Sequence, residues 1–215
     1  MTFLPDLAVL AAFTLAAAIL TITPGPDMTL FMSKTLQQGR AAGAAAVIGA
    51  ASGIVVHSLF AALGISALLA ASATAFAVLK YAGAAYLIYL AVQALRSGSA
   101  LALEEGAGKQ EPLSKVWLQG LTINLLNPKI VLFFVTFLPQ FVSATDPHAA
   151  GKLLFLGFYF ILLAVPSCLA MVFGASAFAR FLKSSPKAMR AFDWAFAGIM
   201  GTFALKLLAA RAAAN

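Results

Sequence analysis

The chain has 215 residues, of which 62% are hydrophobic and only 10% are charged. An average soluble domain has roughly 45–50% apolar and about 25% charged residues, so this composition excludes an ordinary soluble domain and indicates a membrane protein. The net charge of +7 does not indicate nucleic-acid binding, because the basic residues lie between apolar segments and form no dense block.

Apolar segments that approach or exceed the roughly 20 residues needed for a membrane-spanning helix recur along the chain. They cover residues 7–23 (resuming at 28–36), 42–70, 73–95, 117–141, 150–178 and 192–210. The first is expected to be a retained helix, because residues 1–6 contain no Lys or Arg and no small-residue cleavage site ends the apolar run. The pattern predicts an all-α polytopic membrane protein with six transmembrane helices.

The first segment is interrupted by Pro24, Gly25, Pro26 and Asp27. Neither proline has a backbone N–H, so the helical hydrogen-bond ladder must open, and the freed carbonyls need partners from protein or from a watery cavity. A charge at mid-membrane costs roughly 2.5–3.5 kcal/mol, which makes Asp27 a candidate functional residue. The alternative is a helix N-cap at the membrane surface with no transport role.

Helices two and three offer weaker signals. Gly49, Gly53 and His57 recur every four residues, a small-residue stripe that allows close helix approach and ends in a titratable group. The alternative for His57 is a packed polar residue. Tyr86 and Tyr89 share one face of helix three, which is expected either to line a polar cavity or to meet the membrane interface.

The fourth segment places Asn124 and Asn127 on one helical face, directly before Pro128 and Lys129. This second break repeats the first with the opposite charge. The alternative for Lys129 is an ammonium group that extends to the cytoplasmic interface.

The only long polar stretch, residues 96–115, is typical of a linker between two halves. Shifting the chain by 102 residues pairs the Pro26-Asp27 dipeptide with Pro128-Lys129. We therefore predict a single transporter domain of two inverted three-helix repeats, about 1–95 and 116–215, with helices one and four broken at proline. Asp27 and Lys129 would then occupy equivalent positions and approach each other.

Basic residues are distributed unequally between the two sides of the predicted membrane domain. Nine lie on the side of the connections after helices one, three and five, and four lie on the opposite side. The positive-inside rule places the first set in the cytoplasm and both termini outside. The nine are Lys34, Arg40, Arg96, Lys109, Lys115, Arg180, Lys183, Lys187 and Arg190, and the four are Lys80, Lys152, Lys206 and Arg211.

Metal, cofactor and enzyme chemistry have little support in the sequence. The histidines are His57 and His148, and Cys168 is the single cysteine, so there is no cluster with ligand spacing and no intrachain disulfide. Phosphate-binding glycine loops and nucleophile motifs are absent as well. No cofactor and no enzymatic activity are expected.

Three stretches together resemble the lysine exporter superfamily, in particular the LysE/RhtB-type homoserine and threonine exporters. They are TPGPD (23–27), AGAAYLIYLAVQALR (82–96) and LTINLLNPKIVLFFVTFLPQF (121–141). The resemblance implies an inner-membrane exporter of amino acids or their relatives, driven by the proton gradient. Members export threonine, homoserine, leucine, lysine or arginine. Other branches move metal ions or electrons, against which the shortage of His and Cys argues.

The resemblance and the two breaks together predict alternating access around a midplane site. Half-helix N-termini are expected to hold the substrate carboxylate, and exposed carbonyls with Asn124 or Asn127 to receive its ammonium group. Asp27 would couple a proton, and Lys129 would offset its charge. A small zwitterion such as threonine or homoserine is expected, because a dibasic substrate should require further intramembrane carboxylates, and only Asp27 and Asp193 lie near spans.

The expected partners are this substrate, protons and the lipid bilayer, and the small-residue stripes are compatible with a homodimer. The competing class is a membrane protein that does not transport, such as an assembly or electron-transfer component, in which the breaks merely fit helices together. A further alternative is an exporter of another small solute or of a metal ion.

Overall fold

A computed structural model describes four continuous stretches of the chain and scattered single positions elsewhere. The stretches are 4–23, 25–65, 110–143 and 146–175, and the single positions lie between 81 and 96 and between 177 and 208. The four stretches consist of helices and their connections, without strands, as the composition predicts. The expected third and sixth spans lie largely outside the described residues, so the six-span inverted repeat stays a prediction.

The first expected span consists of two helices, α1 (Leu7–Ile22) and α2 (Pro26–Gln38), which meet at an angle of 51°. Pro26 is the first residue of α2, where its missing N–H is harmless and its fixed φ suits a helix start. Asp27 follows in the first turn, where the helix dipole favours a negative charge. The predicted break is therefore confirmed. It places the C-terminal end of α1 and the N-terminal end of α2 in the interior.

A tight turn at Gly39 leads into the second long helix. Gly39 has a φ of 91°, in the region that glycine adopts without strain, so the chain reverses between α2 and α3 (Arg40–Phe60) with no longer loop. A short π-helical turn, η1 (Ala61–Ile65), continues α3.

The fourth expected span is also broken. It consists of α6 (Leu113–Leu126), α7 (Pro128–Leu132), the π-helical turn η2 (Phe133–Phe137) and the 3₁₀ turn η3 (Leu138–Phe141). The bend between α6 and the run that starts at Lys129 is 53°. Because α6 begins at Leu113, the last residues of the predicted linker are helical.

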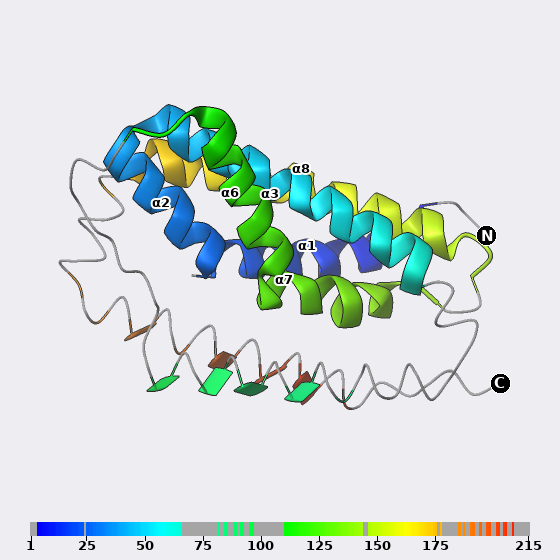
Figure 1. Cartoon of the computed structure of the whole chain (residues 1–215). Helices are drawn as coiled ribbons and strands as arrows, with labels where there is room; N and C mark the ends of the chain where they lie inside the picture. The colour runs from blue at the N-terminus through cyan, green and yellow to red at the C-terminus, as the bar shows by residue number, and fades with distance from the viewer. Residues whose placement is uncertain are drawn as a thin grey trace.

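Two of the described helices, α3 with η1 and α8 (Ala149–Phe173), are long and apolar enough to cross a membrane on their own. Counting each bent pair as one span raises the number of candidate spans among the described residues to four. In Figure 1, α3 and α8 run alongside each other, and α1 and the α7–η3 run lie beneath them.

Glycines bring α3 and α6 into close contact. A Cβ at Gly49 would clash with the Trp117 carbonyl, and one at Gly120 would clash with the Ala46 carbonyl. One turn further along α3, the space that a Cβ on Gly53 would need is occupied by Asn124. The predicted close approach is thus confirmed, and because it is made inside the chain, the Gly49–Gly53 stripe gives no support to a homodimer.

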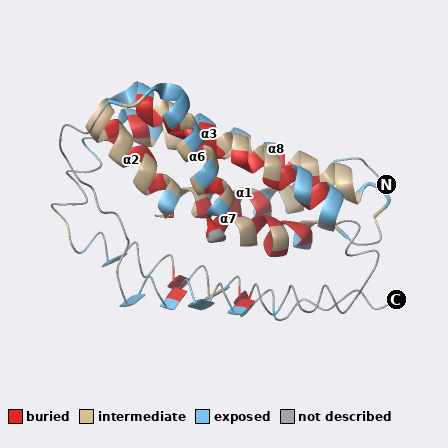
Figure 2. Cartoon of the chain, viewed as in Figure 1, coloured by how far each residue is buried: buried red, intermediate tan, exposed pale blue. Residues whose placement is uncertain are grey.

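Aromatic side chains fill the space between α1, α7, η2 and α8. Phe13, Phe133, Phe134 and Phe160 are each at most 3% exposed and pack in one cluster. Figure 2 shows buried residues on the sides where the helices face one another and exposed residues on the outer sides. Many exposed residues are large and apolar, which suits lipid as the surrounding solvent.

Candidate functional site

The two helix breaks meet, and Asp27 joins them. One carboxylate oxygen, Oδ2, accepts hydrogen bonds from the side-chain amides of Asn124 and Asn127, both at 3.0 Å. The amides come from the end of α6 and from the residue that caps α7, so the start of α2 is fixed to the second break. Asn124 and Asn127 are each 1% exposed, which makes this an interior polar cluster.

Lys129 connects the second break to the first. Its ammonium group donates to the main-chain carbonyls of Leu20 (3.2 Å) and Thr23 (3.0 Å), at the end of α1. Helix residues four positions before a proline lose their usual N–H partner, and Leu20 stands in that relation to Pro24. Lys129 therefore supplies the donors that the first break removes, and a cation at a helix C-terminus also suits the dipole.

Gly25 makes this approach possible. A Cβ on Gly25 would lie 3.2 Å from the Lys129 ammonium nitrogen and 3.5 Å from the adjacent carbon, tighter than ordinary contacts. The glycine between the prolines thus leaves room for a buried lysine side chain from the other half of the chain.

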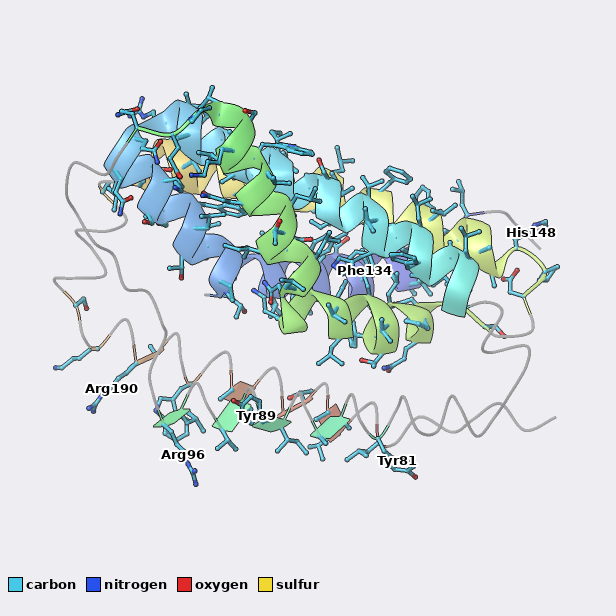
Figure 3. All side chains as sticks on the ribbon, viewed as in Figure 1. Tyr81, Tyr89, Arg96, Phe134, His148 and Arg190 are labelled. Carbon is cyan, nitrogen blue, oxygen red and sulfur yellow. The ribbon has the colours of Figure 1, made fainter. Side chains whose placement is uncertain are left out.

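His57 serves the second break in the same way. Pro128 removes the N–H that an unbroken helix would give the Asn124 carbonyl, which accepts instead from the Asn127 N–H at 3.1 Å. The His57 ring nitrogen Nε2 lies 3.3 Å from the same oxygen. Because a carbonyl oxygen only accepts, the bond requires the proton on Nε2. The ring also stacks on Phe134, with 5.7 Å between centroids, near the middle of the described bundle (Figure 3).

A cavity of about 50 Å³ lies where the two breaks meet. Asp27, Asn124 and Lys129 line it on the polar side. Its remaining wall is mostly apolar, and this volume has room for a few water-sized groups. The apolar wall includes Phe31, Ile54, Ile130, Phe160, Ala164 and Val165.

Most of the predicted site residues within the described stretches come together here. Gly25, Asp27, Asn124, Asn127 and Lys129 join in the contacts given above, as does His57. Pro26 and Pro128 are the first residues of their helices. Pro24 and Tyr86 lie outside the described residues. Tyr89 is 56% exposed and lies apart from Phe134 in Figure 3.

Asp27 and Lys129 approach the same cavity, as expected, but they do not bond each other directly. Both line the cavity, yet among the described residues their charged groups are held by other partners, amides for Asp27 and carbonyls for Lys129. The ion pairs of the described part of the chain lie elsewhere. The physical reason is that Lys129 donates to carbonyls at the end of α1, while Asp27 accepts from two side-chain amides at the second break.

Sequence reasoning missed the apolar wall that α8 contributes. Phe160, Ala164 and Cys168 recur every four residues on one face of α8 and line the cavity. The sequence of a continuous apolar helix does not indicate which of its faces meets a site. For Ile130, by contrast, the position next to Lys129 indicated that it lies near the site.

Comparison with known proteins gives a consistent picture. The family model of the LysE type translocators matches residues 18–211. The chain is 34% identical to the uncharacterized membrane protein YrhP of Bacillus subtilis, over 82% of this chain and 87% of that protein. It is 30% identical to the homoserine/homoserine lactone efflux protein of Salmonella typhi, over 93% and 96% of the two chains.

A leucine efflux protein from Enterobacter sp. is also 30% identical, over 81% of this chain and 83% of its own length. No solved structure matches the chain.

Proposed function

The chain belongs to the LysE type translocator family, and from this premise we propose that it exports small amino acids across the bacterial inner membrane. One observation carries the proposal: a buried carboxylate, two amides and an ammonium group converge on a cavity where two broken helices meet. Interrupted helices paired around a small polar site are typical of secondary transporters. The relatives named for homoserine and leucine efflux support the same general activity.

The proposed mechanism is proton-coupled antiport by alternating access. Asp27 takes up the proton, and Lys129 balances the carboxylate when the site is empty. The breaks between α1 and α2 and between α6 and α7 are the points at which half-helices can change their angle. The basic connections face the cytoplasm and both termini face outward, in accordance with the charge bias.

The proposed substrate is a small amino acid with an uncharged side chain, of the threonine or homoserine kind. Asp27 is the only acidic residue among the described residues that line the cavity, and the opposite wall is apolar. A dibasic substrate would bury a second cation there without a partner, which is costly. The substrates in the relatives' names, homoserine and leucine, also have uncharged side chains.

Efflux from loaded vesicles tests this function. Inside-out vesicles containing the protein should take up radiolabelled threonine, homoserine or leucine when their lumen is acidic. Dissipating the pH gradient should abolish accumulation but not exchange. Accumulation of arginine or lysine alone would overturn the substrate class. No gradient-driven movement of any amino acid would favour a membrane component that does not transport amino acids.

A further inference from the structure

Two buried oxygens beside the cavity have no hydrogen-bond donor in the part of the chain that the structure describes. They are Asp27 Oδ1 and the side-chain oxygen of Asn124, and both residues line the cavity. A third such atom belongs to Gln119, which does not line it. Buried acceptors are nearly always paired, so two beside one cavity call for a donor that the described residues do not supply.

The two oxygens of the Asp27 carboxylate differ in their hydrogen bonds. Its Oδ2 accepts from both Asn124 and Asn127, while Oδ1 is left for another donor. Asn127 has both ends of its amide committed, because its oxygen accepts from the Lys129 backbone N–H at 3.0 Å. The open acceptors are therefore the single oxygens of Asp27 and Asn124.

Lys129 presents the complementary charge to the same cavity. An ammonium group has three N–H donors, and the carbonyls of Leu20 and Thr23 occupy two of them. Among the described residues these are its acceptors, which leaves one N–H for a further acceptor. The residues that line the cavity thus include two with an unpaired buried acceptor, one of them anionic, one with a cationic donor, and an apolar wall.

We propose that this cavity is a receptor for a zwitterion. The α-ammonium group of the amino acid binds Asp27 Oδ1 and the Asn124 side-chain oxygen, its α-carboxylate binds Lys129, and its side chain meets the apolar wall. On the return step a proton takes the place of the ammonium group on Asp27, and Lys129 balances the carboxylate when neither is bound. The assignment rests on the proposed function and adds to it the orientation of the substrate and the origin of the coupling.

Coupling follows from competition for one oxygen. With Oδ2 saturated, Asp27 can bond either a proton or a substrate ammonium through Oδ1. Binding of the zwitterion to the protonated site therefore releases one proton, and return of the proton releases the substrate. The site exchanges one proton for one amino acid without any further titratable group.

Three other titratable groups face this region from the elements packed around it. Lys129 on α7 and Cys168 on α8 line the cavity, and His57 on α3 contacts Asn124. Of these, His57 is the group whose ordinary titration range overlaps the working pH, so it needs a control. His57→Gln keeps an N–H donor for the Asn124 carbonyl and removes the titration.

Calorimetry on the purified full chain tests the receptor. Binding of L-threonine, L-homoserine and L-leucine is measured in buffers of different ionisation enthalpy, which gives the number of protons released. Two analogues of leucine separate its groups: L-leucinamide keeps the ammonium group, and 4-methylpentanoate keeps the carboxylate.

The amino acid that binds should release up to one proton. Once Asp27 is protonated, the affinity should fall about tenfold for each unit by which the pH is lowered. L-Leucinamide should bind more weakly than leucine but still release a proton. 4-Methylpentanoate should bind more weakly and release none. Asp27→Asn should abolish proton release, and His57→Gln should retain it.

The analogue series uses the native chain, so it decides the matter even if Asp27→Asn does not fold. If 4-methylpentanoate binds as tightly as leucine, or if amino acids bind without releasing protons at every pH tested, the receptor is overturned while amino-acid export stands. If no amino acid binds and none is moved by vesicles, the proposed function fails and the receptor fails with it.

Discussion

Individual side chains at the two breaks donate hydrogen bonds to carbonyls at the ends of the broken helices. Lys129 donates to the carbonyls at the end of α1, and His57 to the Asn124 carbonyl at the end of α6. In hydrocarbon a carbonyl without any donor costs several kcal/mol. The Asn124 carbonyl also accepts from the Asn127 N–H at 3.1 Å, so His57 adds a second bond there. The charged and polar residues of the site therefore support the fold as well as the proposed chemistry.

Lys129→Met should lower the thermal stability of the purified protein. Methionine fills a similar volume but leaves the Leu20 and Thr23 carbonyls without these donors, at about 1–3 kcal/mol for each buried group. It also leaves Asp27 without the cation that lines the same cavity. Combining it with Asp27→Asn should restore part of the loss, because the amide removes the buried charge but not the two carbonyls.

The measurement is a double-mutant cycle on the melting temperature. Partial recovery supports both roles of Lys129. Strict additivity would show that the ammonium acts on the carbonyls alone and would remove its role in balancing Asp27.

Asp27→Asn should abolish accumulation against a gradient while leaving some exchange. The amide retains a side-chain oxygen for a hydrogen bond but binds no proton in the working pH range, so transport loses its coupling. Radiolabel accumulation and counterflow in the same vesicles separate the two activities. Accumulation at the native level by this variant would reduce Asp27 to a structural residue at the start of α2.

At the scale of elements, the crossing of α3 and α6 positions the site. Gly49 and Gly120 bring the two helices into contact, and Gly53 faces Asn124 one turn further along α3. Asn124 is thereby held against α3 while its amide reaches Asp27. Close packing of small residues is a common means of association between membrane helices.

Gly49→Ala should destabilise the protein by about 1–3 kcal/mol, because the added methyl group meets the Trp117 main chain, which cannot move aside as a flexible side chain can. Gly64→Ala is the matched control, since a Cβ at Gly64 has nothing within 4 Å. Melting temperatures of both variants in one detergent check the expectation. Equal stability of the two would mean that the α3–α6 crossing is looser than described.

Glu111, which precedes α6, connects the C-terminal part of α2 to the N-terminal end of α6. Its carboxylate accepts from Lys115 at 2.6 Å and from Lys34 on α2, and its N–H donates to the Gln38 side chain at 2.9 Å. The hydrogen bond from Lys115, followed by that from Lys34, lowers the pKa of Glu111 from 4.5 to about 2. The two broken spans are thus connected at these ends as well as at their breaks.

Glu111→Gln should lower the melting temperature near neutral pH and have little effect near pH 2. A carboxyl group with a depressed pKa stabilises the folded state above its unfolded pKa, and this contribution disappears as the pH falls from about 4.5 toward 2. Asp6→Asn is the control, because the Asp6 side chain makes no capping hydrogen bond to α1. A Glu111→Gln effect that persists unchanged at low pH would contradict the ion-pair explanation.

For the whole molecule, the sequence predicted what depends on local chemistry. The breaks follow from prolines that lack an N–H, and the α3 stripe follows from glycine spacing. The partner of each freed carbonyl was not predictable, because Lys129 is 109 residues from Leu20 along the chain. The same holds for the wall that α8 contributes, since only tertiary packing decides which face of an apolar helix meets the cavity.

The orientation of the molecule in the membrane is the final prediction, and it follows from the unequal distribution of basic residues. Nine basic residues on one side against four on the other place the connections after helices one, three and five in the cytoplasm. In a Cys168→Ala background, Ser99→Cys should therefore be protected from an impermeant thiol reagent in intact cells. Ser143→Cys, in the exposed connection before α8, should be labelled.

Permeabilised cells should label both positions, which verifies that each cysteine is reactive. Labelling of Ser99→Cys but not of Ser143→Cys in intact cells would invert the topology. The pH gradient sets the direction in which a proton antiporter moves its substrate, so this result would overturn the topology inferred from the charge bias and leave the export direction standing.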